Sequence, residues 1–232
     1  HGFATLRGTS YNSYLILDER NVLIDSVKTP FLGEMMARIR SVIDPKEIDL
    51  IVSNHAEGDH ASGLPLTQQI TGAEILATKK GLEALRLNYG EMRMREVADG
   101  EELSIGRRTL RFIETPMVHW PESMFTYAVE DQILFSMDAF GQHYCSSQRY
   151  DDQVDLGTLM EEAATYYANI VLPFGAQVKK AYAKVKELPI KLLATSHGLM
   201  WRTHIKDIVE AYVGWADHRT EERVLVIFDT MW

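Results

Sequence analysis

The sequence predicts an α+β sandwich of αββα type, in which two mixed sheets pack face to face and helices cover both outer surfaces. The chain opens with two strands separated by a turn and then alternates strands with helices, and both patterns recur in its second half. Strands and helices in this order pack as layers around a common core. With 232 residues, 46% of them hydrophobic, the chain is long enough to build that core.

The first half begins with two β-rich segments, 10–17 and 22–25, on either side of the polar turn 18–21. A helix is predicted from Pro30 to Ile43, because proline suits the first helical turn and apolar residues follow at helical spacing. The remaining elements of this half are strands at 49–52 and 74–77 and helices at 61–70 and 79–88.

The second half starts with four more β-rich segments and then alternates again. The predicted strands are 92–97, 109–113, 124–129, 132–136, 191–195 and 223–228. The predicted helices are 156–169, 179–186 and 204–217. No segment approaches the roughly 20 consecutive apolar residues of a membrane span, and we expect no membrane partner.

Charge and cysteine content narrow the range of partners. The net charge of -9 at pH 7 argues against binding to a nucleic-acid backbone or an anionic membrane surface. The single cysteine, Cys145, excludes a disulfide framework and a thiolate metal cluster. A chain of this kind is expected in the reducing cytoplasm.

Four side chains that can bind metal follow the apolar strand 49–52 directly. They are His55, Glu57, Asp59 and His60. In an extended backbone, residues two apart point to the same side, so the first two can face one cation together. A solvated polar loop is the simpler interpretation of any one of these residues. Four donors within six positions favour a metal site, provided that other loops add ligands.

Three further segments place a possible ligand at the end of a strand. His119 stands between two prolines, Asp138 ends an apolar strand, and His197 ends another and is followed by a glycine. Each has an ordinary structural alternative: a hydrogen-bonded core histidine, a helix cap and a surface loop residue, respectively. Together with the first cluster they supply four imidazoles and three carboxylates.

The order His-x-Glu-x-Asp-His, lone His, lone Asp, lone His resembles the metallo-β-lactamase fold. Hydrolases of that fold carry histidine at the second position, where this sequence has Glu57. This substitution, together with the segments 116–124, 138–143 and 196–198, resembles the flavodiiron proteins, also called A-type flavoproteins or rubredoxin:oxygen oxidoreductases. The resemblance covers almost the whole chain.

The resemblance implies a site with two irons and an oxo or hydroxo bridge. One iron is implied to have the ligands His55, Glu57 and His119, and the other Asp59, His60 and His197, with Asp138 between them. It also implies that residues 1–222 form a metallo-β-lactamase-like diiron domain and that residues 223–232 are the first strand of a truncated flavodoxin-like domain. This chain alone is therefore not expected to hold FMN.

The activity implied by the resemblance is the reduction of O2 to water, of NO to N2O, or of both. Electrons are implied to come from an FMN domain and rubredoxin, in a head-to-tail homodimer. Tyr166 and His1 are the candidates for catalytic groups near the irons, although Tyr166 and Tyr167 also suit simple packing on a helix face. The alternatives are a zinc hydrolase of the same fold, which Glu57 argues against, and a non-catalytic sensor of NO or O2.

Overall fold

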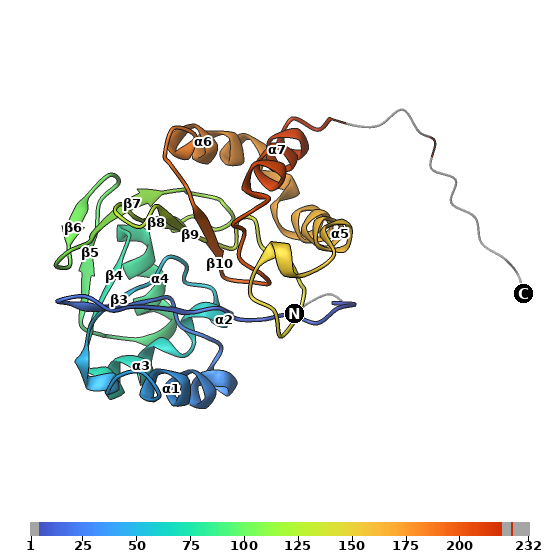
Figure 1. Ribbon diagram of the computed structural model, residues 1–232. Coiled ribbons are helices and arrows are strands. Elements are labelled where there is room, and N and C mark those ends of the chain that lie inside the picture. Colours follow the sequence, from blue (N-terminus) through green and yellow to red (C-terminus); the bar gives the residue numbers. More distant parts are fainter. Residues whose placement is uncertain (1–4, 220–223, 225–232) are drawn as a thin grey trace, which may run out of the picture.

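The structure is a computed structural model that describes residues 5–219 and 224, and it consists of two five-stranded sheets (Figure 1). The strands of the first sheet are β1 (Tyr14–Ile16), β2 (Asn21–Ile24), β3 (Ile48–Val52), β4 (Glu74–Ala77) and β5 (Met94–Glu96), in that order. β1 runs antiparallel to β2, and the other neighbours are parallel. The first sheet is therefore mixed.

The second sheet is also mixed and has the order β10-β9-β8-β7-β6. Its strands are β6 (Glu102–Ser104), β7 (Thr109–Glu114), β8 (Met124–Ala128), β9 (Ile133–Met137) and β10 (Leu192–Thr195). Only β9 and β10 pair in parallel. Consequently β7, β9 and β10 all point the same way, and their carboxyl ends lie at one edge of the sheet.

Helices cover the outer face of each sheet (Figure 1). Those of the first half are α1 (Leu32–Arg40), α2 (Gly58–Ala61), α3 (Leu64–Thr71) and α4 (Lys79–Tyr89). Those of the second half are α5 (Leu156–Tyr166), α6 (Gly175–Val185) and α7 (Ile205–Ala216). The predicted layered fold, two packed sheets with helices outside, is confirmed.

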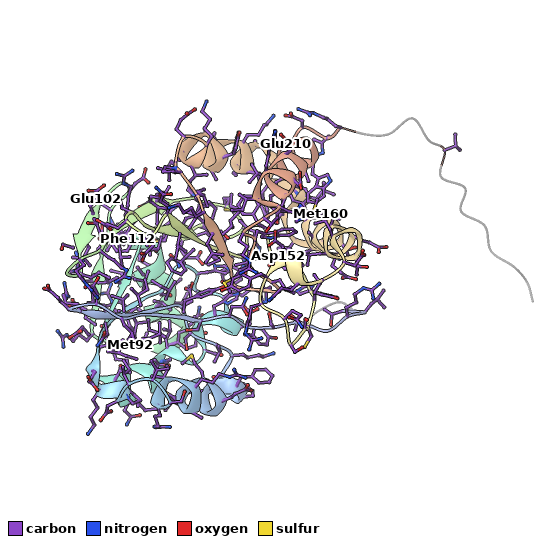
Figure 2. All side chains as sticks on the ribbon, in the orientation of Figure 1. Met92, Glu102, Phe112, Asp152, Met160 and Glu210 are labelled. Carbon is purple, nitrogen blue, oxygen red and sulfur yellow. The ribbon has the colours of Figure 1, made fainter. Side chains whose placement is uncertain are left out.

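Strand β3 shows why the apolar run before the first ligand cluster is continuous. Leu50 and Val52 pack between the two sheets, in the same cluster as Phe112 (Figure 2). Ile51, between them in sequence, packs on the opposite face with α1, α3 and α4. A strand buried on both faces needs apolar residues at every such position, and it anchors the loop that follows it.

Of the segment predicted as a strand at 10–17, only β1 pairs with a neighbouring strand. Residues before β1 bind the loop after β10 instead. The Asn12 backbone N–H donates to the Ser196 carbonyl at 2.8 Å, and its side-chain amide donates to the carbonyls of Thr195 and Gly198 at 2.9 Å each. Hydrogen bonds to a loop have replaced the ladder that the β-rich composition predicted.

Several helix boundaries also differ from prediction. The helix predicted at 179–186 begins earlier, at Gly175. The first predicted helix ends at Arg40, where the Ser41 hydroxyl donates to a carbonyl of the last turn at 2.6 Å. The helix predicted at 61–70 begins at Leu64, after the separate short helix α2. The helix predicted at 156–169 ends at Tyr166 and continues as the π-helical turn Tyr167–Val171. Such wider turns are frequent at functional sites.

Two outcomes remain for the strands. The short edge strand β6 was not predicted, because only Leu103 among its three residues is apolar and its side chains are largely exposed. The strand predicted at 223–228 lies outside the described residues apart from Val224. None of the helices in the described part of the chain is long and apolar enough to cross a membrane.

Replacing Gly198 by alanine tests how the loop after β10 is held. Gly198 has φ +78°, and a Cβ there would overlap the side-chain amide of Gln142 and lie 2.6 Å from its backbone carbonyl oxygen. We expect a loss of about 2 kcal/mol or more in the free energy of unfolding, measured by urea denaturation. The control Gly33→Ala, in α1 with open space around it, should stabilise the protein by roughly 0.5–1 kcal/mol. Equal effects of the two substitutions would contradict this account.

Candidate metal centre

The seven predicted ligands all lie in segments that follow strands. Residues 53–60 follow β3, with Asp59 and His60 in the short helix α2. The loop holding His119 connects β7 to β8, Asp138 follows β9, and His197 follows β10. The structure brings all seven side chains together as two adjacent groups. Donor atoms of His55, Glu57, His119 and Asp138 form one, and donor atoms of Asp59, His60 and His197 form the other, with all atoms of a group within 4.8 Å of one another.

In the first group the histidines converge on two carboxylates. Oε2 of Glu57 lies 3.1 Å from Nε2 of His55 and 3.2 Å from Nε2 of His119. Oδ2 of Asp138 lies 3.5 Å and 3.1 Å from the same two nitrogens. The two nitrogens and two oxygens therefore face one common point, as ligands of a cation do.

The second group has the same design. Asp59 places Oδ1 at 3.5 Å from Nε2 of His60 and Oδ2 at 3.3 Å from Nε2 of His197. The other oxygen of Asp138, Oδ1, lies 3.0 Å from the His60 nitrogen and 3.4 Å from the His197 nitrogen. Asp138 thus directs one oxygen at each group, which is the arrangement of a bridging carboxylate.

Several of these atoms are buried and yet have no hydrogen-bond partner within the described part of the chain. They include Oδ1 of Asp59, Nε2 of His60 and Oδ1 of Asp138. Nε2 of His60 and Oδ1 of Asp138 are only 3.0 Å apart, but they are not oriented to form a hydrogen bond with each other. Leaving a buried polar atom unsatisfied costs free energy. Atoms that are close but aimed past one another fit a third partner between them, so the donor set is suited to metal.

Charges within the centre shift the pKa of its groups. Burial alone lowers the pKa of His55, but hydrogen bonds to two carboxylates and the charge of Asp138 raise it to about 10. Burial also opposes charge on His119, whose pKa nevertheless rises to about 9 through Asp138 and Glu57. Burial raises the pKa of Asp138, but charge on His60 and the hydrogen bond with His119 hold it well below its usual range. This carboxylate is therefore ionised, as a metal ligand must be.

The outer nitrogens of two histidines are held by hydrogen bonds. Nδ1 of His55 lies 2.8 Å from Oε1 of Glu122, which also accepts the Ala56 N–H at 3.0 Å. Nδ1 of His197 donates to the carbonyl of Ser10 at 2.7 Å. A proton held on Nδ1 leaves Nε2 as the nitrogen that can lose its proton and bind a metal in the centre.

A buried hydrogen-bond network holds the start of the ligand segment 53–60 in place. The Asp25 carboxylate accepts the backbone N–H of Asn54 at 2.7 Å and its side-chain amide at 2.9 Å. The side-chain oxygen Oδ1 of Asn54 in turn accepts the Thr126 hydroxyl at 2.7 Å. These bonds tie the end of β3 to β8, and so couple the ligand loop to the second sheet.

Of the two tyrosines considered, Tyr166 faces the centre and Tyr167 does not. The ring of Tyr166 is buried 5.8 Å from the His197 ring, and its hydroxyl has no hydrogen-bond partner among the described residues. Tyr167 packs against Tyr212 and Trp215, at 4.9 Å and 5.1 Å between ring centroids. A catalytic role for Tyr166 stays a prediction, and His1 lies outside the described residues.

Sequence reasoning did not single out four groups around the ligands: Glu122, Asp25, His143 and the Ser10 carbonyl. His143 is buried with its ring 4.8 Å from the Tyr166 ring, and burial and the charge of His197 lower its pKa to about 4. A carboxylate three residues after His119 was a usable signal for Glu122. The Ser10 carbonyl carries no side-chain signal at all.

The family of the chain follows from a family model that matches residues 9–198, described as ODP family beta lactamase. The chain belongs to this family. Among curated relatives of this ODP domain, a protein named nitric oxide reductase from Moorella thermoacetica is 43% identical over all of this chain and 60% of its own length. A protein named anaerobic nitric oxide reductase flavorubredoxin, from Salmonella arizonae, is 45% identical over all of this chain and 50% of its own length.

Solved structures agree with these relatives. The flavodiiron protein of Giardia intestinalis matches this ODP domain with a TM-score of 0.92 and 43% identity, over 94% of this chain and 55% of that one. Rubredoxin oxygen:oxidoreductase of Desulfovibrio gigas matches with a TM-score of 0.89 and 37% identity, over 92% and 55%. The resemblance to flavodiiron proteins is confirmed. The chain spans 50–60% of the length of these two curated relatives.

Glu122 provides a test of how the centre is supported. Replacing it by alanine removes the carboxylate that orients His55, so we expect the metal affinity of the first group to fall by about 10- to 100-fold. Competition with a metal-sensing dye measures this affinity. The control Glu101→Ala removes a carboxylate bound to Ala98 and Arg95 away from the centre and should leave affinity unchanged. A folded Glu122→Ala protein with unaltered affinity would show that this carboxylate does not orient the ligand.

Proposed function

We propose that the seven side chains hold two iron ions and that the protein reduces NO to N2O, O2 to water, or both. The observation that carries the proposal is Asp138, whose two oxygens face two separate groups of donors. The names of the relatives from Moorella thermoacetica, Salmonella arizonae and Desulfovibrio gigas support the activity.

The proposed ligands of one iron are His55, Glu57 and His119, and those of the other are Asp59, His60 and His197, with Asp138 shared. Carboxylate ligands are hard donors that suit iron passing between ferrous and ferric states. Three carboxylates also offset most of the charge of two ferrous ions. The relatives and structures cited above are named as reductases, oxidoreductases and flavodiiron proteins, which gives the zinc hydrolase alternative no support.

When bound, two ferrous ions supply two electrons and open coordination positions for a diatomic substrate. The protein contributes geometry. Asp138 fixes the separation of the two groups, and the hydrogen bonds of His55 and His197 hold their rings in the ligating orientation. Tyr166 is the proposed donor of a hydrogen bond to substrate, because its buried hydroxyl has no other partner among the described residues. His1 is proposed only from the sequence.

Reduction of two NO molecules to N2O and water consumes two electrons and two protons, and reduction of O2 to two waters consumes four of each. A further electron donor is therefore required. We propose an FMN-binding flavodoxin-like domain and rubredoxin as this donor, in a head-to-tail homodimer in the cytoplasm. The names flavorubredoxin and rubredoxin oxygen:oxidoreductase support a rubredoxin-linked pathway. Residues 1–222 are the proposed diiron domain, and residues 223–232 the proposed start of the flavodoxin-like domain.

An activity assay tests the proposal directly. The iron-loaded protein is reduced with a chemical reductant under anaerobic conditions and mixed with NO or with O2. We expect N2O formation, measured by gas chromatography, or O2 uptake, measured with an electrode. The zinc-loaded protein is the control and should be inactive. Hydrolysis of a β-lactam or thioester without reductant, together with no consumption of either gas, would refute the proposal.

Three substitutions, one at Asp138 and two at Glu57, separate the proposed bridging carboxylate from an ordinary ligand. Asp138→Asn weakens a ligand of both ions, so we expect both affinities to fall by more than about 100-fold. Glu57→Ala removes a ligand from one group and should reduce iron content from about two ions to about one. Glu57→His should shift preference toward zinc and abolish reduction of both gases. Metal analysis by mass spectrometry checks the metal content of all three variants, and the activity assay described above checks gas reduction by Glu57→His. Loss of only one ion in Asp138→Asn would exclude a bridge.

A further inference from the structure

A small apolar crevice lies between α6 and α7, on the outer side of the second sheet. Its volume is about 20 Å³, and its lining atoms are almost all apolar. Its floor is formed by Val118, Ala139 and Phe140, which are all buried. Val209 and Val213 of α7 are partly exposed at its other end, so the crevice opens at the surface between the two helices.

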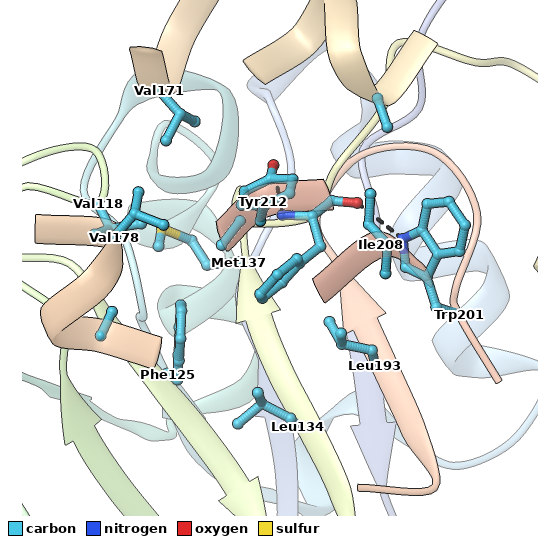
Figure 3. Packing of buried hydrophobic residues seen from close by; sticks show 14 of the residues in the cluster. Val118, Phe125, Leu134, Met137, Val171, Val178, Leu193, Trp201, Ile208 and Tyr212 are labelled. Carbon is cyan, nitrogen blue, oxygen red and sulfur yellow. Dashed lines mark hydrogen bonds between the residues drawn. The ribbon is translucent and has the colours of Figure 1, made fainter. Parts of the chain in front are cut away.

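The residues that form the floor of the crevice are adjacent in sequence to two of the proposed metal ligands. Val118 immediately precedes His119, and Ala139 and Phe140 immediately follow Asp138. Figure 3 shows Val118 among the apolar side chains of this region, near Val178 of α6. The crevice therefore ends at the two loops that carry a terminal ligand and the bridging carboxylate.

From its position, size and lining, we infer that this crevice binds a diatomic gas and supplies it to the metal centre. The inference rests on the proposed function for the identity of the gas. NO and O2 have almost no hydrogen-bonding capacity, and apolar cavities in proteins stay dry and take up apolar guests. A volume of about 20 Å³ is enough for one molecule of this size.

A second, larger hollow is a less suitable gas site. It has a volume of about 740 Å³, and its lining includes Ser10 and Gly198, which is next to His197 in sequence. Its lining includes the charged side chains of Arg38 and Arg149. A hollow of that size with charged walls holds water, so an apolar gas gains little there over bulk solvent. The two hollows therefore make different predictions for where a gas is found.

Gas pressure on crystals tests the binding step without any reaction. Crystals of the unreduced, metal-loaded protein are pressurised with krypton, whose anomalous scattering locates it. We expect a krypton site lined by Val118, Phe140 and Val178, higher occupancy in Val178→Ala, and loss of the site in Val213→Phe. Krypton absent from the crevice of the unsubstituted protein, or present only in the larger hollow, would overturn the inference.

Rapid mixing tests the supply step. NO binding to the reduced, iron-loaded protein is followed by stopped-flow absorbance. Val213→Phe, at the mouth, should slow the association rate by about tenfold with iron content unchanged. Glu210→Phe adds the same bulk on the exposed side of α7 (Figure 2) and should leave the rate unchanged. An unaltered rate in Val213→Phe would overturn the supply role.

Different results would refute the proposed function and the supply role of the crevice. If iron-loaded protein takes krypton in the crevice but never binds NO, the proposed function is wrong while the crevice stands as a gas site. If NO is bound and reduced at equal rates in both phenylalanine variants, the proposed function stands and the supply role of the crevice is wrong.

Discussion

Asp138 is buried with its two carboxylate oxygens directed at different sets of histidines. A buried carboxylate is costly unless positive charge or hydrogen bonds compensate it. Here the compensation comes from both sides, because His119 lies near one oxygen and His60 near the other. The rest of the structure holds these groups in place. The position of one carboxylate therefore determines whether the protein has two coupled sites or two unrelated ones.

The fold meets this constraint because four of its strands, β3, β7, β9 and β10, end at the metal centre. β3 leads to the first ligand cluster, while β7, β9 and β10 run in the same direction and deliver His119, Asp138 and His197. Apolar side chains on both faces of these strands make their ends rigid. Hydrogen bonds then connect the loops, through the Asp25 carboxylate on one side and the Asn12 amide on the other. The positions of the ligand side chains therefore depend on the strands of both sheets and on the hydrogen bonds between their loops.

The layered fold and the seven candidate ligands could be predicted from sequence because each rests on local signals. Apolar runs mark the strands, and dense polar side chains mark the loops after them. The supports of the ligands could not be predicted in the same way. Ser10 acts through its carbonyl, which any residue has. Glu122 stands close to His119 in the sequence, but its contact with His55 follows only from the packing of the two sheets. Tyr166 and Tyr167 are adjacent in sequence, and only the packing of Tyr167 on Tyr212 separates their roles.

The most direct test of the central claim is anomalous diffraction from crystals of the protein at the iron absorption edge. We expect two iron peaks about 3.5–4 Å apart, one on each side of the Asp138 carboxylate, with each carboxylate oxygen bound to a different ion. A single peak, or two peaks with Asp138 bound to only one of them, would show that Asp138 does not bridge two ions.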